Sequence, residues 1–422
     1  MDKNDFPKLY QKYKALIEDD LMRFWERAFD TEHGGIYTCF SNDGSKLLST
    51  DKYVWSQGRM LWILSRLCEM HDRGMLCLPR EEYARQAAKT RDFILNYSLL
   101  PEEGGVCAYL LEADGTKKES IPGKGYYTSY FVDCFVIMGL MEYARVFRDE
   151  KTAEAALAIY KGMMSYLDRG EIRSEPYPVK KGFRPHSKSM ILCNVCGVSR
   201  DALKALEHPR AAEFEKLAFD YMQEVVFGMY NPENGLIKEM ICDATDEYDD
   251  TVLARHAAPG HGNEDMWFCM EAAGEDEKSL AQIYRIVKAS MAVGWDKEYG
   301  GVFRFCDKDG GAPKGRRIGD PYENLVIDTW DTKLWWVHAE CLYTTLRCYA
   351  QTGDPEFAEW YQKLDEYVFS HFPNPNREIG EWIQILDRRG RPLNKVVALP
   401  VKDPYHILRD VMLIVELLCR YQ

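Results

Sequence analysis

Hydrophobic residues recur at intervals of three and four positions through most of the chain, with polar residues between them. This spacing predicts amphipathic α-helices, because residues three and four apart share one helical face. The predicted helices cover residues 9–28, 54–72, 81–97, 129–148, 151–167, 189–206, 210–227, 278–292, 332–351, 356–370 and 405–421. Strand-like alternation is confined to residues 35–39, 105–110 and 301–305. The pattern therefore predicts a mainly helical protein with short strands in its connections.

A glycine-bearing turn recurs along the chain at nearly regular intervals. The sequences HGGIY, EEGGVCAY, ENGLI and YGGVF share this turn, and DRGEI and REIGEW are weaker copies. Their glycines are Gly34, Gly104, Gly170, Gly235, Gly300 and Gly380, in steps of about 65 to 80 residues. Each step holds two helices, so the chain contains six repeated helix pairs. Such units bury their apolar faces only against neighbouring units.

Six helix pairs can form an open solenoid or close into a double ring. The last predicted helix is as apolar as the internal ones, whereas an open array needs a polar cap at its end. We therefore expect an all-α fold, an (α/α)6 barrel in which six helix hairpins form a closed double ring, with short β-hairpins in the connecting loops. Residues 1–422 would form one domain. Side chains around the central funnel are then the functional candidates.

The composition of the chain argues against several classes of protein and partner. The chain has 54 basic and 67 acidic residues and a net charge of −13, which argues against nucleic acid and anionic membranes as partners. No apolar run reaches transmembrane length, and the first residues, MDKNDFPKLYQKYK, lack the apolar core of a signal peptide. Thirteen cysteines, an odd number, fit reduced thiols in the cytoplasm. Cys193 and Cys196 have CxxC spacing, but their apolar surroundings favour buried side chains over metal ligands.

The stretch PGHGNEDMW, residues 259–267, carries the first candidate chemistry. His261 titrates near neutral pH and can take or give a proton. Glu264 lies three residues later, so both side chains would face the same small volume if a helix begins here. A capped helix start, with Glu264 near the positive end of the helix, is the alternative interpretation.

Two further stretches combine aromatic and charged residues. Trp55 and Arg59 share a helical face with Trp62, which fits either a core stack containing a paired arginine or an arginine presented to an anionic group. Lys333, Trp336 and Glu340 would also share one face. His338 falls on a different, apolar face, where we expect a packed and hydrogen-bonded histidine.

The C-terminal stretch VKDPYHILR carries another histidine. Pro404 is expected to open the last helix, which places His406 in its first turn. The helix dipole there disfavours the imidazolium ion, so a neutral and basic imidazole is expected, with a capping role as the alternative. The sequence contains no GxSxG nucleophile elbow, HExxH zinc motif or dinucleotide fingerprint.

Four motifs together resemble the N-acylglucosamine 2-epimerase family, which includes renin-binding protein, cellobiose 2-epimerases and related aldose–ketose isomerases. The motifs are YVWSQGRMLW around Arg59, PGHGNE around His261, KLWWVHAE at residues 333–340, and EWIQILDRRG followed by VKDPYHILR around His406. They occur in the family's order, and the resemblance covers nearly the whole chain. It implies the (α/α)6 barrel that the repeat also indicates.

The resemblance implies roles for individual residues. His261 and His406 would be the two catalytic bases, one removing the C2 proton of a ring-opened sugar and the other returning a proton on the opposite face. Arg59 would contact the oxygens of the enediolate, which needs a fixed cation or donor. The substrate-binding residues implied by the resemblance are Glu264, Trp336, Glu340, Lys333, Trp55, Asn194 and Lys402.

The match to the family's subgroups is incomplete. Cellobiose 2-epimerases carry an extra histidine in the helix around Asn194, which here reads NVCGVS without one. The C-terminal motif keeps Lys402, His406 and Arg409 but has its proline, Pro404, at a different place. These departures favour a monosaccharide over a disaccharide and leave the sugar itself open.

The resulting expectation is a cytoplasmic isomerase that interconverts N-acetylglucosamine and N-acetylmannosamine. The alternatives are an aldose–ketose isomerase of the mannose type, a cellobiose-type 2-epimerase, a glycoside hydrolase of the same barrel type using Glu264, Asp331 or Glu340, and a non-catalytic binding protein. Proton transfer needs no metal or redox cofactor, and none is expected. Some relatives respond to ATP, but no nucleotide site is expected here. A homodimer is one candidate for the oligomeric state.

Overall fold

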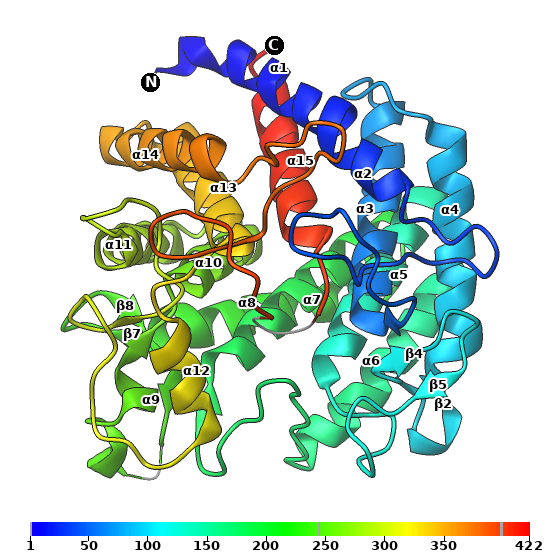
Figure 1. Ribbon diagram of the computed structural model, residues 1–422. Coiled ribbons are helices and arrows are strands. Elements are labelled where there is room, and N and C mark those ends of the chain that lie inside the picture. The colour runs from blue at the N-terminus through cyan, green and yellow to red at the C-terminus, as the bar shows by residue number, and fades with distance from the viewer. Residues whose placement is uncertain (1, 244, 397–399) are drawn as a thin grey trace.

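Six helices of the computed structural model, which describes residues 2–243, 245–396 and 400–422, form a closed inner ring. Each helix contacts the next, and the last contacts the first, so the ring is complete (Figure 1). These helices are α3 (Val54–Asp72), α5 (Tyr130–Phe147), α7 (His186–Ala205), α10 (Pro259–Ala273), α13 (Trp335–Thr352) and α15 (Tyr405–Cys419). The predicted ring closure is confirmed.

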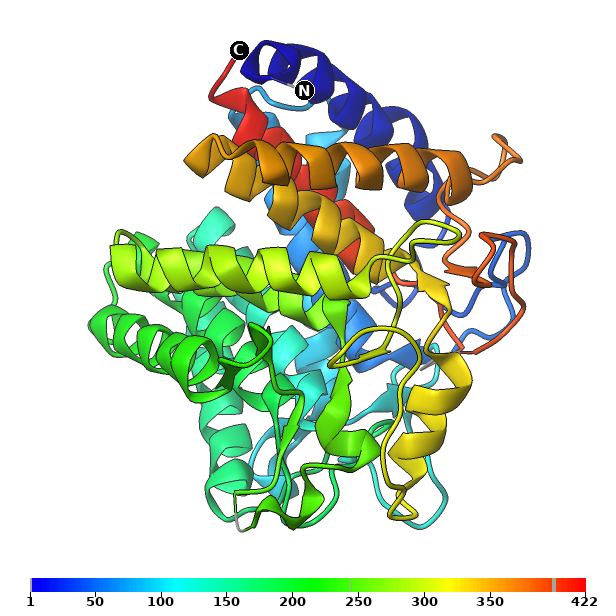
Figure 2. The same ribbon diagram turned by 90° about the vertical axis from the view of Figure 1, so that its left-hand side faces the viewer.

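A second layer of helices packs around this ring. Its members in the described residues are α1 (Phe6–Leu16) with α2 (Met22–Glu26), α4 (Arg80–Phe93), α6 (Glu150–Asp168), α8 (Ala211–Gln223), α11 (Glu277–Gly294) and α14 (Pro355–His371). Five of these pair with the inner helix that precedes them, whereas α1 packs against α15. The two ends of the chain therefore meet and complete the sixth pair (Figures 1 and 2). The architecture is the predicted (α/α)6 barrel.

The connections contain short antiparallel strand pairs and small helices. The strands are β1 (Lys52–Tyr53), β2 (Leu99–Leu100), β3 (Val106–Cys107), β4 (Leu110–Leu111), β5 (Lys117–Lys118), β6 (Arg184–Pro185), β7 (Tyr230–Asn231), β8 (Leu236–Ile237), β9 (Met240–Ile241), β10 (His256–Ala257), β11 (Cys306–Asp307), β12 (Lys333–Leu334) and β13 (Ile385–Leu386). They pair as β1–β4–β5, β2–β3, β6–β9, β7–β8, β10–β11 and β12–β13. The short helices α9 (Val252–Arg255) and α12 (Pro321–Thr329) were not predicted.

Several outer helices end in a wider turn than the hydrophobic pattern suggests. Single π-helical turns lie at Ile17–Leu21, Ile94–Ser98 and Glu224–Gly228, and 3-10 turns lie at Lys3–Asp5, Pro101–Glu103 and Asp246–Tyr248. The helix predicted over residues 332–351 begins only at Trp335. The reason is that Lys333 and Leu334 form β12 and pair with β13.

The six repeated glycines all adopt a left-handed backbone conformation, with φ between 73° and 88°. A side chain is strained in this conformation, which explains why glycine recurs at this point of every repeat. Each of these turns follows an outer helix and precedes the next inner one. Accordingly, the inner helices all begin at the same end of the barrel, where the long loops gather at the right of Figure 2.

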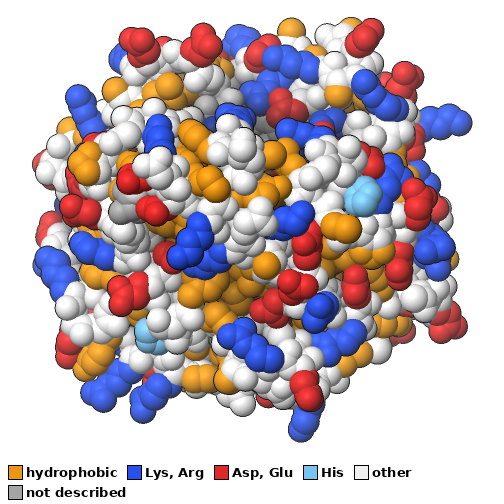
Figure 3. Space-filling view, turned by 90° about the horizontal axis from the view of Figure 1, so that it is seen from above, with side chains coloured by type: hydrophobic (Ala, Val, Ile, Leu, Met, Phe, Trp, Pro, Cys, Tyr) orange, Lys and Arg blue, Asp and Glu red, His pale blue; other side chains and the backbone are white. Residues whose placement is uncertain are grey.

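Burial and surface chemistry agree with a double ring. One large hydrophobic core joins the inner helices to the inward faces of the outer ones. The face seen in Figure 3 carries acidic and basic side chains next to one another, with hydrophobic side chains in the recesses between them. Cys193 and Cys196 are buried free thiols, as predicted. None of the described helices is long and apolar enough to span a membrane.

Candidate active site

A cavity of about 230 Å³ opens at the end of the barrel where the inner helices begin. It collects residues from the first two turns of all six inner helices, α3, α5, α7, α10, α13 and α15. The positive ends of these helix dipoles converge on it, which favours a developing negative charge. Its lining residues that sequence analysis had named are Trp55, Arg59, His261, Glu264, Trp336 and His406. The rest of the wall is largely apolar and includes Phe131, Phe135, Met190, Ile191, Phe305 and Leu325.

His406 lies in the first turn of α15, with Pro404 immediately before the helix, as predicted. Its Nδ1 lies 2.6 Å from Oε1 of Glu340, an entirely buried carboxylate on α13. A carboxylate can only accept there, so Nδ1 carries the hydrogen and donates it. The Nε2 lone pair is therefore available, and the nearest donor to it is Arg59, whose Nη2 lies 3.4 Å away.

The environment of His406 favours its neutral form. Burial lowers the pKa of His406 to about 4, against the opposing effect of Asp403 and Glu264, and the cations Arg59 and Arg409 add to the lowering. At neutral pH His406 is thus an uncharged base. The expected neutral imidazole is favoured, and loss of solvation is the largest cause of the lowered pKa.

Arg59 is both paired with a carboxylate and presented to the cavity, so it fits both interpretations of its sequence pattern. Its Nη1 lies 3.0 Å from Oδ1 of Asp403, and its guanidinium stacks on Phe135 at 3.9 Å from the ring centroid. The same group also lines the cavity beside His406. A fixed cation at this position can stabilise an oxyanion formed in the cavity.

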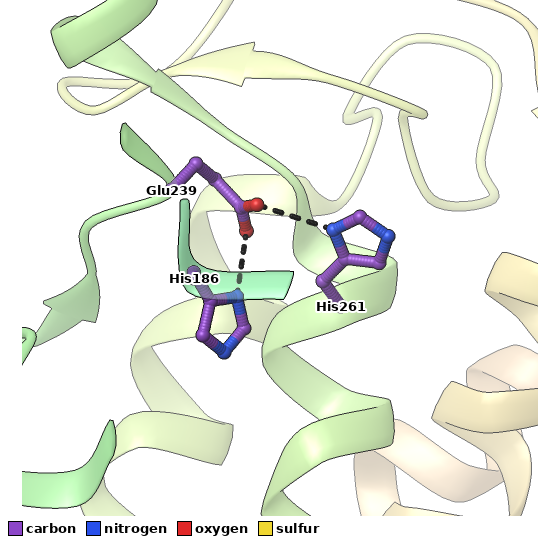
Figure 4. Close-up of side chains that lie close together, drawn as sticks. All are labelled: His186, Glu239 and His261. Carbon is purple, nitrogen blue, oxygen red and sulfur yellow. Dashed lines mark hydrogen bonds and ion pairs between the residues drawn. The ribbon is translucent and has the colours of Figure 1, made fainter. Parts of the chain in front are cut away.

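His261 is in the first turn of α10 and is paired with a carboxylate that sequence analysis did not identify. Its Nδ1 lies 3.1 Å from Oε2 of Glu239, so Nδ1 donates and Nε2 is the free nitrogen (Figure 4). The His261 side chain is 27 % exposed, compared with 10 % for His406. Each of the two histidines therefore has its Nδ1 fixed by a buried glutamate from a different element.

Behind Glu239 lies a third histidine, His186, the first residue of α7. It is fully buried, with Nε2 2.5 Å from Oδ2 of Asp265 and Nδ1 3.6 Å from Oε1 of Glu239. Burial opposes its charge, but the hydrogen bonds to Asp265 and Glu239 outweigh that effect and raise the pKa of His186 to about 10. Asp265, His186, Glu239 and His261 thus form a continuous chain from the interior to the cavity, and Figure 4 shows the last three of these residues.

The indole of Trp336 contacts both candidate bases. Its ring centroid lies 5.2 Å from that of His261 and 5.9 Å from that of His406. Gly260 makes this placement possible, because a Cβ at that position would lie 2.5 Å from Cζ3 of the indole. Trp336 therefore forms a common wall beside the two imidazoles.

A cluster of acidic groups surrounds Arg409 at the base of the site. Arg409 forms ion pairs with Glu264, at 2.7 Å, and with Glu340. Burial and the neighbouring Glu340 raise the pKa of Asp410 well above its usual range. Loss of solvation and repulsion between nearby carboxylates both favour its protonated form.

The carboxylates proposed for a hydrolase do not assemble in the cavity. Glu264 lines the cavity and is paired with Arg409, whereas Glu340 is fully buried behind His406 and Asp331 is not a lining residue. The remaining lining acid, Asp403, is paired with Arg59. Paired carboxylates facing each other across a substrate, as glycoside hydrolysis requires, are therefore not formed by the predicted residues.

Four residues assigned to substrate binding, namely Lys333, Lys402, Asn194 and Glu340, are not among the lining residues of the cavity. Lys333 is entirely buried against Asp296, at 3.2 Å, instead of lying on a helical face with Trp336. Lys402 is held by Glu381 at 2.6 Å and donates to the backbone oxygen of Trp382 at the same distance. Both ammonium groups form ion pairs inside the protein, because burying an unpaired charge is unfavourable in free energy.

Asn194 and His338 complete the comparison with the sequence. Asn194 lies two turns into α7 and is not among the lining residues, so its contact with substrate stays a prediction. His338 is packed as expected, donating from Nδ1 to the Leu334 oxygen at 2.7 Å and accepting from the Val302 amide at 2.9 Å.

Two sets of side chains have metal-ligand geometry, with their ligand atoms within 4.8 Å of one another. They are His186, Glu239 and His261, and Glu264, Glu340 and His406. In the second set Arg409 contacts both glutamates and supplies the positive charge. The expectation of a metal-free site stays a prediction.

Comparison with known proteins agrees with the fold. The family model described as N-acylglucosamine 2-epimerase matches residues 34–409. The mouse protein named N-acylglucosamine 2-epimerase is 28 % identical over 97 % of this chain and 92 % of its own length, and a cellobiose 2-epimerase of Ruminococcus albus is 22 % identical over 92 % and 94 %. The solved structure of cellobiose 2-epimerase from Bacillus thermoamylovorans superposes with a TM-score of 0.75 at 16 % identity, covering 97 % of this chain and 99 % of that one. The chain belongs to the N-acylglucosamine 2-epimerase family.

Proposed function

We propose that the protein is a sugar 2-epimerase that interconverts N-acetylglucosamine and N-acetylmannosamine. The observation that carries this proposal is the pair of histidines on different inner helices, α10 and α15, which line one cavity and have their Nδ1 atoms bound to buried glutamates. Both Nε2 atoms are left for proton transfer. Relatives named N-acylglucosamine 2-epimerase that match nearly the whole chain support the choice of sugar.

The reaction follows from this arrangement. The C2 proton of a ring-opened N-acetylhexosamine is acidic because the neighbouring aldehyde stabilises the carbanion as an enolate. One histidine removes this proton with its neutral Nε2, and the Arg59 guanidinium stabilises the enolate oxygen. The other histidine enters the step as an imidazolium ion and gives its Nε2 proton to the opposite face of C2. The bond to hydrogen at C2 is broken and reformed with inversion, and no electrons leave the sugar. We therefore propose that the enzyme works without a redox cofactor or metal.

We also propose a monosaccharide substrate and a cytoplasmic location. The cavity of about 230 Å³ suits a single sugar, and its apolar wall suits the methyl group of an N-acetyl substituent. The net charge of −13 supports a small-molecule substrate over nucleic acid or an anionic membrane.

An exchange experiment tests the proposal. The protein is incubated with N-acetylmannosamine in D2O, and the C2 signal is followed by proton NMR. Deuterium at C2 together with a growing N-acetylglucosamine signal is expected. A ketose product would instead identify an aldose–ketose isomerase, and the absence of exchange with N-acetylmannosamine, mannose and cellobiose would refute proton transfer at C2.

Substitution of the two bases localises the activity. His261→Asn and His406→Asn each remove one Nε2 and are expected to abolish turnover with an unchanged circular dichroism spectrum. His338→Asn is the matched control, because His338 is buried in the same barrel but does not line the cavity. Ordinary turnover in a folded His261 or His406 variant would remove that residue from the mechanism.

A further inference from the structure

We propose that His186 is a positioning residue that holds a positive charge between Asp265 and Glu239 and thereby keeps the Glu239 carboxylate ionised against Nδ1 of His261. The inference rests on the proposed function, since it concerns the base that the epimerisation uses. It adds a residue that touches neither the cavity nor any reacting atom.

The geometry favours a charged His186. Its side chain is completely buried, its Nε2 lies 2.5 Å from Oδ2 of Asp265, and its Nδ1 forms an ion-pair contact with Oε1 of Glu239 at 3.6 Å. Both neighbours are carboxylates, which offer lone pairs and no hydrogens when ionised. A neutral imidazole would turn a ring nitrogen lone pair toward one carboxylate, whereas the imidazolium ion turns an N–H toward each of them.

The backbone brings these groups together from three segments. Strand β6 pairs with β9, with Pro185 opposite Met240, and the His186 amide donates to the Glu239 oxygen at 2.9 Å. This pairing places the His186 side chain beside Glu239, while α10 supplies Asp265 and His261. One Glu239 oxygen accepts from His261 and the other faces the His186 ring as an ion pair, so a positive charge on His186 favours this orientation of the carboxylate.

The charges around His186 determine how its replacement changes proton binding in this cluster. The groups that face His186 are Asp265 and His261 from α10 and Glu239 from the loop before β9. Cys269 donates to Asp265, and the buried, neutral His256 lies near Glu239. With His186 charged, the three groups His186, Asp265 and Glu239 carry a net charge of −1. Replacing His186 by a neutral residue makes this −2, so the cluster, including His261, must bind a proton more tightly.

The variant His186→Gln tests this coupling through the pH profile. The two ring centroids of His186 and His261 are 6.3 Å apart. At an effective dielectric constant of about 20, removal of a unit charge at this distance moves a titration by about two pH units. We expect the acid limb of kcat/KM in D2O exchange to move upward by about one to two pH units, with kcat lowered about 10- to 100-fold and KM nearly unchanged.

Two other variants distinguish the loss of the positive charge on His186 from general damage to the fold. Asp265→Asn removes a negative charge from the same cluster, so its acid limb must not move upward. His338→Gln removes another fully buried imidazole that bonds only to backbone groups, and its acid limb should match that of the wild type. An unmoved limb in folded His186→Gln, or equal shifts in all three variants, would overturn the proposal.

Nitrogen-15 NMR of histidine-labelled protein gives a readout independent of activity. At pH 8 we expect one imidazolium signal, with both ring nitrogens protonated, that disappears in His186→Gln. A neutral His186 would overturn the proposal, as would one zinc ion per chain bound to His186, Glu239 and His261 in the purified protein. An inactive wild type with an intact imidazolium signal would instead count against the proposed function alone.

Discussion

Glu340→Gln is the substitution that most directly tests how the barrel prepares a base. Three donors converge on the two oxygens of Glu340: His406 Nδ1 at 2.6 Å and Arg409 on Oε1, and the Trp267 indole at 2.8 Å on Oε2. A glutamine has one oxygen and one NH2 group, so in either orientation a donor faces a donor. With the NH2 group toward His406, the imidazole must move its hydrogen to Nε2, where it can no longer accept a proton from the sugar.

The size of the effect can be worked from this geometry. Inverting the tautomer of a catalytic histidine by a carboxylate-to-amide change costs on the order of 10³- to 10⁴-fold in kcat, or about 4 to 5 kcal/mol in the activation free energy. The fold should tolerate the change, because Arg409 keeps its ion pair with Glu264 at 2.7 Å. We therefore expect kcat to fall by about 10³-fold or more, with KM changing far less.

The assay is the steady-state rate of N-acetylmannosamine epimerisation, together with thermal unfolding to verify the fold. Glu271→Gln is the matched control. Glu271 is on α10, the helix of His261, and pairs with Arg347 at 2.5 Å, but it does not line the cavity. A folded Glu340→Gln enzyme whose kcat stays within threefold of the wild type would refute the claim that Glu340 sets the tautomer of His406.

Three other expectations follow from the buried contacts. Gly260→Ala places a Cβ 2.5 Å from the Trp336 ring, so the indole must shift, and we expect kcat to fall while the unfolding free energy drops by about 1 to 3 kcal/mol. Lys402→Met leaves the Glu381 carboxylate buried without its cation and should cost about 3 to 5 kcal/mol of stability in chemical denaturation, with KM unchanged. Burial lowers the pKa of His338 to about 3, so the unfolded chain binds a proton on this histidine at a higher pH than the folded protein does. The unfolding free energy should therefore decrease as the pH falls from 6.5 toward 3. In His338→Gln the dependence of the unfolding free energy on pH, measured by chemical denaturation, should be smaller by about 1.4 kcal/mol per pH unit.

Each of these expectations has a control or an opposing outcome. Gly197→Ala adds a methyl group inside α7 that meets no neighbouring element within 4 Å, so it should leave kcat unchanged and raise stability by about 0.5 to 1 kcal/mol. A tenfold rise in KM for Lys402→Met would restore that lysine to substrate binding. An unchanged pH slope in His338→Gln would mean that His338 is protonated in the folded protein.

The architecture and much of the cavity could be predicted from sequence for identifiable reasons. The helix spacing and the six glycines record local constraints, namely burial of one helical face and a left-handed turn, so both are visible without the fold. Trp55, Arg59, His261 and Trp336 were found because each sits in a motif in the first turns of an inner helix. Since all inner helices begin at the same end of the barrel, predicting the ring also predicted that these residues would meet.

The errors arise where a side chain's partner is distant in the chain. Lys333 was assigned to a helical face because the strand pairing that holds it involves residues about 50 positions later. Lys402 resembles a substrate ligand in its motif, and only the folded structure shows Glu381 beside it. Glu239 and His186 were missed for the same reason, because a single glutamate in a loop carries no pattern until β6 and β9 pair.

Closure of the ring also builds the catalytic site. Arg59 is on α3, the first inner helix. Its partner His406 is on α15, the last inner helix, and its partner Asp403 lies two residues before α15, so these contacts cross the seam where the chain ends meet. Glu340 joins the same seam from α13. An open array of the same six helix pairs would keep each histidine but would separate the cation from the base beside it. The seam therefore has to be tight for function as well as stability, and the packing of α1 against α15 from outside stabilises that contact.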